Sequence, residues 1–514
     1  MLVVLLIALA WILPHAEPIL HDRVVHALSA RFKSPVELDQ IHISLAHGFR
    51  VEGGGLRILY LAGPSLPDVR QKPPPMLNIR SFQFQASLRE LLSPTLRLVS
   101  ARVQGAELRI PPPGGRNLFP HDDRAHTGQP AEGLFIDRII IDDLKIVIEN
   151  KITGKPPLAF DVSNLTLTDV GLKKPFNYEA TLRNPKPVGD VHSTGHFGPW
   201  QSDNPRDTPL DGGYSFTHVD LGSIKGLSGT LSSTGNFHGT LGGILIDGSA
   251  DTPDLRLTVS GHPLPLHADF HAIVDATTGD TYLQPVNALL QHSRVVASGS
   301  ITRKTGVPGH DIELDVEVGP GRIDDMLTLA GKTYPPALRG ALTARCRLSI
   351  PPGPDRVTQR MRLNGSFTVS QGVFTNTRLQ QQINGISERA RARPEYANAQ
   401  MAEAVTSSMK GSFNLANEQM QISGMTYQMP GATVLADGQY GLDGKTLDFH
   451  GTVRTQATAS EMVGGWKQLL VMPFDRFLKK NGAGVELPFK VGGTQADPKL
   501  DLDFGHKAKP SPAR

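Results

Sequence analysis

Strict alternation of apolar and polar residues is the feature that most constrains this chain. Residues 313–318 read ELDVEV, in which Leu314, Val316 and Val318 alternate with three acids. Successive side chains of an extended strand point to opposite sides, so this stretch has one hydrocarbon face and one charged face. The same alternation recurs along most of the chain and predicts on the order of twenty strands, separated by turn dipeptides such as Asp-Gly and Asn-Gly.

The glycine and proline content supports a mainly β fold. The sequence has 52 Gly and 40 Pro among 514 residues, about 18% against a usual ~12%. This excess suits many short strands joined by turns. Helices are predicted at few places: a short one before Pro35, one at 87–92, one at 322–330, one near 378–409 and one near 457–480.

The N-terminus begins with an unbroken apolar run from Met1 to Leu13. As a helix this run covers only about 20 Å, less than the ~30 Å hydrocarbon core of a bilayer. Pro14 interrupts it, and no Lys or Arg precedes it. The run is therefore predicted to be either a short membrane anchor or a signal segment, and the choice between them stays open.

Several function classes lack their sequence signatures. Lys and Arg (52) nearly balance Asp and Glu (49), so nucleic acid is not an expected partner. The motifs HExxH, CxxC and GxSxG are absent, AGKT at 330–333 lacks the upstream glycine of a phosphate-binding loop, and HDDRAH at 121–126 reads as a solvated loop. We expect no enzyme activity, no metal and no cofactor. The single cysteine, Cys346, permits no internal disulfide.

The C-terminal part resembles the AsmA-like family of envelope proteins. Residues 375–392, 411–454 and 463–505 carry the resemblance, with Gly-Trp-Lys at 465–467, Phe-Leu-Lys-Lys-x-Gly-Ala-Gly at 477–484 and Gly-Gly-Thr-x-x-Asp-Pro-Lys at 492–499 as its most specific motifs. Looser similarity extends over most of the chain.

The resemblance implies an elongated, curled antiparallel β-sheet with an apolar groove, a few helices and an N-terminal membrane helix. It also implies a single anchor in the inner membrane, with most of the chain in the periplasm. Members are linked to phospholipid transport and outer-membrane assembly. The expected partners are therefore membrane lipids through their acyl chains, the inner membrane and other envelope proteins.

If the apolar strand faces line a groove, acyl chains would contact one set of alternating residues. The predicted lining residues are Leu144, Ile146, Ile148, Leu165, Leu167, Leu255, Leu257, Val259, Leu314, Val316, Val318, Phe367, Val369, Leu447, Phe449, Leu487, Phe489, Leu500 and Leu502. A helix near 457–480 is predicted either to close the groove or lie at a membrane interface through Trp466, Leu470, Phe474 and Phe477, or simply to pack on the sheet.

The predicted organisation has six segments: 1–34 (anchor or signal plus short helix), 35–110 (β), 111–133 (Pro/Gly loop), 134–376 (central β-groove), 377–505 (AsmA-like region) and 506–514 (disordered tail). One alternative stays open. Ordinary β-sandwich domains with closed dry cores would show the same alternation, and would suit a structural or regulatory scaffold in outer-membrane biogenesis that carries no lipid.

Overall fold

The structure is a computed structural model. It describes residues 17–18, 21–26, 28–29, 34–44, 49–59, 75–86, 97–110, 135–148, 157–171, 174–201, 204–258, 262–304, 307–331, 334–397, 405–463, 484–494 and 498–502. Strands make up 66% of the structure and form a curled sheet that does not close. The predicted mainly β, curled fold with few helices is confirmed.

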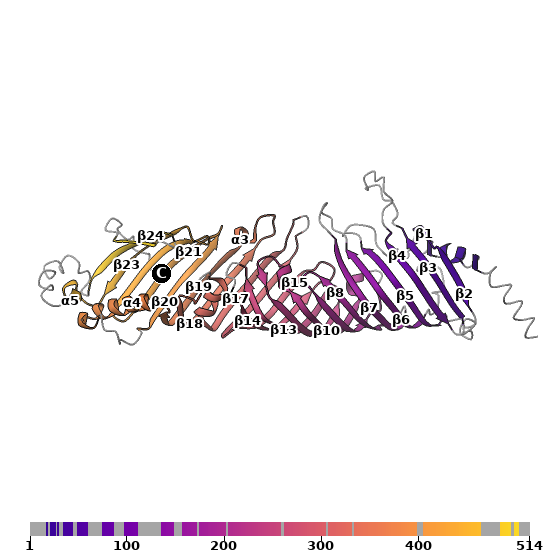
Figure 1. The fold of residues 1–514 in the computed structure, drawn as a ribbon, viewed down its shortest axis with the longest axis horizontal. Helices are drawn as coiled ribbons and strands as arrows, with labels where there is room; N and C mark the ends of the chain where they lie inside the picture. The colour runs from indigo at the N-terminus through magenta and orange to yellow at the C-terminus, as the bar shows by residue number, and fades with distance from the viewer. Residues whose placement is uncertain are drawn as a thin grey trace, which may run out of the picture. The chain divides into compact units, whose positions relative to one another are not determined.

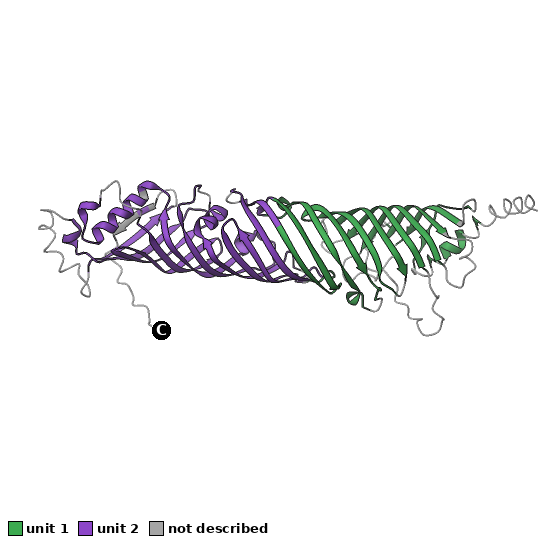
Figure 2. Cartoon of the chain, turned by 90° about the horizontal axis from the view of Figure 1, so that it is seen from below, with its two compact units in different colours: residues 1–225, 230–250, 274–277 green, residues 226–229, 251–273, 278–514 purple. Residues whose placement is uncertain are grey.

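Hydrogen bonding assigns the 25 strands of the described residues to one sheet, and the chain divides into two compact units, coloured separately in Figure 2. Unit 1 comprises residues 1–225, 230–250 and 274–277, and unit 2 comprises residues 226–229, 251–273 and 278–514. The division falls within the predicted central segment 134–376.

Unit 1 is a run of neighbouring strands, most of which are labelled in Figure 1. Its strands are β1 (Val36–Glu37), β2 (Gln40–Ser44), β3 (Phe49–Ile58), β4 (Leu77–Ala86), β5 (Arg97–Ile110), β6 (Phe135–Ile148), β7 (Leu158–Gly171), β8 (Phe176–Pro185), β9 (Val188–Phe197), β10 (Pro209–Asp220), β12 (Thr230–Thr240) and the first half of β13 (Gly243–Leu257). Strands β1 and β2 both pair with β3, which leaves them at the edge of the described sheet.

One pair in unit 1 departs from the predicted antiparallel sheet. Strands β5 and β6 are parallel, with Arg97 opposite Phe135 and Ile110 opposite Ile148. A parallel pair needs a connection of a dozen or more residues to return the chain to the starting end. Residues 111–134, which contain the predicted Pro/Gly loop, are long enough for this return, and their structure lies outside the described residues.

Unit 2 contains the remaining strands and the described helices α2 to α5. Its strands are β11 (Leu227–Ser228), the second half of β13, β14 (Leu264–Val274), β15 (Thr281–Leu290), β16 (Ser293–Thr302), β17 (Asp311–Arg322), β18 (Leu338–Ile350), β19 (Arg362–Phe374), β20 (Ser407–Ala416), β21 (Gln419–Met429), β22 (Ala432–Gly441), β23 (Leu447–Thr455), β24 (Glu486–Gly493) and β25 (Pro498–Leu502). Its helices are α2 (Ile323–Ala330), α3 (Val357–Arg360), α4 (Thr377–Ala390) and α5 (Ala459–Val463).

The predicted helices have different outcomes. Helix α2 confirms the one predicted at 322–330. Helix α4 is shorter than the predicted 378–409, because it ends at Ala390 and strand β20 begins at Ser407. Helix α5 covers only the start of the predicted 457–480, since 464–483 lie outside the described residues, as do 87–92.

The predicted anchor run, Met1 to Leu13, also lies outside the described residues. None of the described helices combines the length and apolar character needed to cross a bilayer. Residues 17–18, 21–26 and 28–29 are helical, as predicted for the segment before Pro35. From this helix Val24 and Val25 pack on the core formed by Leu38, Ile41, Val51 and Phe82.

Aligned irregularities cross neighbouring strands of unit 1. Gly55, Gly105 and Asp143 have positive φ values of 68°, 64° and 59°. The pairing skips all three, for example from Gln104↔Asp142 to Ala106↔Leu144. The skipped residues of neighbouring strands lie opposite one another, so the strands stay in register across the irregularity. Each skipped residue also shifts the in-and-out alternation of side chains by one position. Apolar residues three apart, such as Ile141 and Leu144, therefore lie on the same face.

In unit 2, a buried carboxylate fixes helix α2 to the sheet. Asp325 is 4% exposed, and its Oδ2 accepts hydrogen bonds from Ser293 Oγ at 2.7 Å and from the His292 backbone N–H at 3.0 Å. Ser293 Oγ in turn accepts from the Arg322 backbone N–H at 2.9 Å. The turn between β15 and β16 and the first turn of α2 are thereby held together.

Replacing Asp325 by alanine should therefore loosen helix α2. The buried Ser293 hydroxyl and the part-buried His292 backbone N–H lose their acceptor, and an unsatisfied buried group costs about 1–3 kcal/mol. We expect a lower urea midpoint for Asp325→Ala and faster hydrogen exchange in α2. The neighbouring Asp324→Asn should change both by much less, because Asp324 pairs with the partly exposed Arg322 on the surface. Equal effects of the two substitutions would contradict the proposed anchoring role of Asp325.

Candidate functional site

The predicted lining residues of β17 lie on one continuous apolar face in unit 2. Leu314, Val316 and Val318 face Leu348, Cys346 and Ala344 of β18. The same face continues on both sides. Its further pairs include Val295↔Val318, Ala297↔Val316, Ala344↔Phe367, Leu342↔Val369, Leu348↔Leu363 and Val369↔Met409. The register therefore brings residues of β16 to β20 into one hydrocarbon surface.

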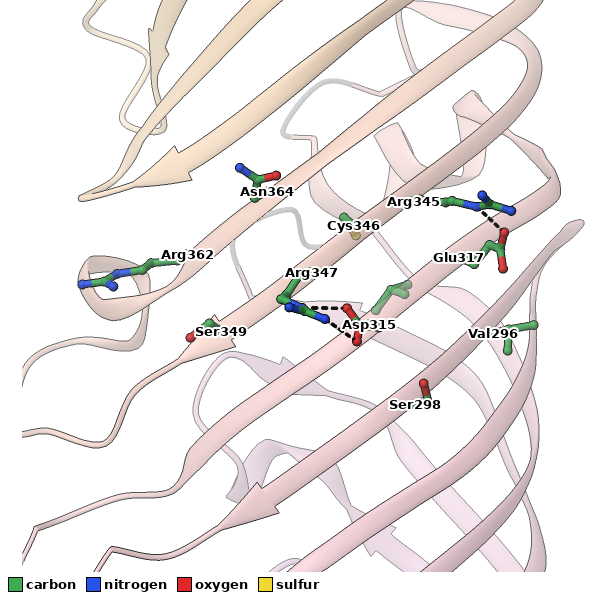
Figure 3. Close-up of a pocket in the computed structure, with 11 residues that line it drawn as sticks. Val296, Ser298, Asp315, Glu317, Arg345, Cys346, Arg347, Ser349, Arg362 and Asn364 are labelled. Carbon is green, nitrogen blue, oxygen red and sulfur yellow. Dashed lines mark hydrogen bonds and ion pairs between the residues drawn. The ribbon is translucent and has the colours of Figure 1, made fainter.

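The opposite face of the same strands is polar and cross-linked by ion pairs. Arg347 Nε and Nη2 donate to the Asp315 carboxylate at 2.8 and 2.9 Å, and Arg345 pairs with Glu317, as Figure 3 shows. The hydrogen bond and charge of Arg347 lower the pKa of Asp315. A shallow depression of about 610 Å³ lies among these side chains, and Val296, Ser298, Val316 and Cys346 also border it.

Helix α2 covers the apolar face at one end of the strands, and protein covers the rest of this face only partly. Helix α2 packs Ile323, Met326 and Leu327 against a buried cluster of Val318, Leu338, Leu342 and Val369. Leu342 is 4% exposed and Val369 is 1% exposed there. Further along the same strands and on the same face, Val316, Leu314 and Phe367 are only half-buried. The apolar face therefore remains partly accessible away from α2.

Strands β20 to β24 extend the apolar face within unit 2. Leu447 and Phe449 lie opposite Tyr440 and Gly438. Val453 faces Leu487, and Gly451 faces Phe489. All four predicted lining residues of β23 and β24 are half-buried. Leu500 and Leu502 pair through their backbones with Val491 and Phe489, and their side chains lie outside the description.

Unit 1 has an apolar face of its own, formed by β3 to β12. Leu144, Ile146 and Ile148 lie opposite Val162, Phe160 and Leu158. They also lie beside Ala106, Leu108 and Ile110 of β5. Leu144 is buried in a cluster with Ala106 and Val162, whereas Ile146, Ile148, Leu165 and Leu167 are half-buried.

The remaining predicted site residues lie on β13 or outside the described residues. Leu257 on β13 faces Leu227, and both Leu255 and Leu257 are half-buried. Val259 lies outside the described residues, and so do Trp466, Leu470, Phe474 and Phe477 of the predicted interface helix.

Cys346 gives the apolar face one chemically distinctive group. Its thiol is half-buried, and burial raises its pKa. The residue lies between Val316 on β17 and Gly365 on β19. Among the residues that the structure describes, no group of three or more His, Cys, Asp or Glu side chains is arranged to hold a metal ion.

Sequence reasoning missed polar side chains on the apolar face. Tyr178 of β8, Ser193 of β9 and Ser233 of β12 are flanked by exposed residues, and the register places Tyr214 of β10 on the same face as Ser193. The sequence did indicate the face of Tyr178, because Tyr178, Ala180 and Leu182 are spaced two apart and would share one face of a strand. The predicted lining residues are aliphatic or Phe and therefore do not include these side chains.

Comparison with models of known protein families, with curated proteins and with solved structures gave no match. The chemistry of the two sheet faces is therefore the basis for a functional proposal.

Proposed function

We propose that this protein binds the acyl chains of membrane lipids along its apolar sheet faces and takes part in phospholipid transport and outer-membrane assembly. In this proposal it is an AsmA-like protein, anchored in the inner membrane by its N-terminal apolar run, with most of the chain in the periplasm. The observation that carries the proposal is the half-buried state of Leu314, Val316 and Phe367, on a face that helix α2 covers around Val318, Leu338, Leu342 and Val369.

Hydrocarbon chemistry explains what such a face can do. A folded protein usually buries the apolar side of its sheet against another layer. Side chains left partly exposed can instead bury a ligand's hydrocarbon, at about 0.8 kcal/mol for each CH₂ removed from water. An apolar track would therefore lower the free energy of an acyl chain that leaves a bilayer, without any covalent step. The ion-paired polar face keeps the other side of the same strands in water.

Mass spectrometry of lipids that co-purify with the full chain tests this proposal most directly. We expect phospholipid to be recovered with the protein after thorough washing. Recovery of the folded chain without lipid, together with failure to take up added phospholipid, would contradict lipid transport. That result would favour the alternative, a scaffold that holds assembly partners in the envelope.

Cys346 supplies a built-in reporter for occupancy of the apolar face. A thiolate is the reactive species in alkylation, and an acyl chain lying over β17 to β19 would exclude both water and reagent. We expect N-ethylmaleimide to label Cys346 several-fold more slowly after phospholipid is added. Thr343→Cys in a Cys346→Ala background is the matched control, because Thr343 is exposed on the opposite face of the same strand. Slowing at both positions, or at neither, would contradict binding to the apolar face.

A further inference from the structure

Two pairs of hydroxyl groups interrupt the apolar face of unit 1. Tyr178 on β8 shares its face with Ala180 and Leu182, while Asn177 and Glu179 between them are exposed. Ser193, Tyr214 and Ser233 occupy the same face of β9, β10 and β12. The register places them there, with Ala180↔Ser193, Ser193↔Tyr214 and Phe216↔Ser233 as direct pairs.

Both pairs have the same geometry. Tyr178 lies opposite Gly195, and its hydroxyl is 3.1 Å from the Oγ of Ser193, two residues earlier on that strand. Tyr214 lies opposite Gly235, and its hydroxyl is 3.1 Å from Ser233 Oγ. A glycine opposite an aromatic residue leaves room for the ring to lie across the neighbouring strand.

The direction of these hydrogen bonds follows from the serines. Ser193 Oγ donates its one hydrogen to the Gly213 carbonyl oxygen at 3.0 Å, and Ser233 Oγ donates to the Ser249 carbonyl oxygen at 2.8 Å. Each tyrosine must therefore donate its own hydrogen to the serine. Burial raises the pKa of Tyr178 and of Tyr214, so both phenols stay neutral near pH 7.

Each phenolic oxygen then has lone pairs left to accept a further hydrogen bond. Within the described residues, no group donates to either oxygen. The apolar positions of β4 to β7, in contrast, carry hydrocarbon side chains; they include Ile79, Phe82, Val103, Ile141 and Leu165. An unsubstituted acyl chain over β8 to β12 would remove the two acceptors from water without a partner, which is unfavourable.

We propose that the oxygens of Tyr178 and Tyr214 accept a hydrogen bond from a hydroxyl group carried on an acyl chain, so that this part of the face prefers hydroxylated chains. This inference rests on the proposed function. The donor is assigned to the chain and not to a lipid headgroup because both tyrosines lie mid-strand between apolar residues of the same face. Their neighbours there are Phe176 and Ala180 on β8 and Phe216 on β10.

The test compares 3-hydroxytetradecanoic acid with tetradecanoic acid, bound to the purified full chain and measured by displacement of a fluorescent fatty acid. We expect the hydroxylated acid to bind about two- to tenfold more tightly, the range of one net neutral hydrogen bond. In Tyr178→Phe/Tyr214→Phe this preference should disappear, while tetradecanoic acid should bind as well as before or better. Tyr282→Phe is the matched control, because Tyr282 is exposed on β15 and its loss should leave the preference intact.

The outcomes separate this inference from the proposed function. If neither acid binds, the proposed function fails. If both bind equally to the wild-type chain, or if the double variant keeps the preference, the assignment of the tyrosines is overturned while lipid binding stands. A preference for phosphatidylethanolamine over phosphatidylcholine that the double variant loses, with the two acids binding equally, would overturn the acyl hydroxyl in favour of a headgroup. Circular dichroism checks folding, and the two single Tyr→Phe variants should each remove part of the preference.

Discussion

A carboxylate at position 316 is expected to weaken lipid binding by unit 2 strongly while leaving its sheet folded. Val316 lies mid-strand on the apolar face, between Ala297 of β16 and Cys346 of β18, and is half-buried. An acyl chain crossing this position in Val316→Asp would have to remove an unpaired carboxylate from water, which costs several kcal/mol. Affinity should fall by more than about tenfold, since 1.4 kcal/mol already gives that factor.

The matched control for this substitution lies on the adjacent strand. Thr343 is exposed on the polar face of β18, opposite Thr368, so Thr343→Asp adds the same charge on the water-facing side. Binding is measured by displacement of a fluorescent phospholipid analogue, and folding by circular dichroism and urea unfolding. Val316→Asn separates the effect of charge from the effect of polarity, and should weaken binding less. A folded Val316→Asp chain with normal affinity would rule out acyl chains crossing β17.

The alternation in the sequence predicted which side of β17 is apolar because no irregularity interrupts residues 313–318. Leu314, Val316 and Val318 are on the less exposed face, and Glu313, Asp315 and Glu317 are exposed. In β6 the same reasoning identified only Leu144, Ile146 and Ile148, although Ile139 and Ile141 share their face. The reason is Asp143, whose positive φ shifts the alternation by one residue. Such shifts depend on neighbouring strands, which the local pattern does not contain.

The features that the sequence did not predict depend on contacts between residues far apart in the chain. The parallel pairing of β5 with β6 depends on the return path of residues 111–134. The anchoring of α2 depends on Asp325 meeting Ser293, 32 residues away. The hydroxyl pairs depend on Tyr178 and Tyr214 lying opposite glycines of the next strand. In each case the residues are ordinary in sequence, and their role comes from the partner that the register supplies.

Two leucines on one strand should respond oppositely to truncation. Leu342 and Leu348 share β18 and its apolar face, but Leu342 is 4% exposed under helix α2, whereas Leu348 is half-buried beside Leu314 and Leu363. Leu342→Ala would leave a cavity in a packed cluster and should lower the free energy of unfolding by about 2–5 kcal/mol. Leu348→Ala loses less buried area and should cost about 1 kcal/mol or less.

Lipid affinity should show the reverse order. Leu348 is exposed enough to contact an acyl chain, so its truncation should weaken lipid binding several-fold, while Leu342 is already covered by Ile323, Met326 and Leu327. Urea unfolding, with hydrogen exchange of β17 to β19 to assign the transition to unit 2, measures stability, and fluorescent lipid displacement measures affinity. If Leu348→Ala destabilises as strongly as Leu342→Ala and leaves lipid binding unchanged, the apolar face along β18 is a closed core. A side chain that protein buries completely contributes to stability but cannot contact an acyl chain.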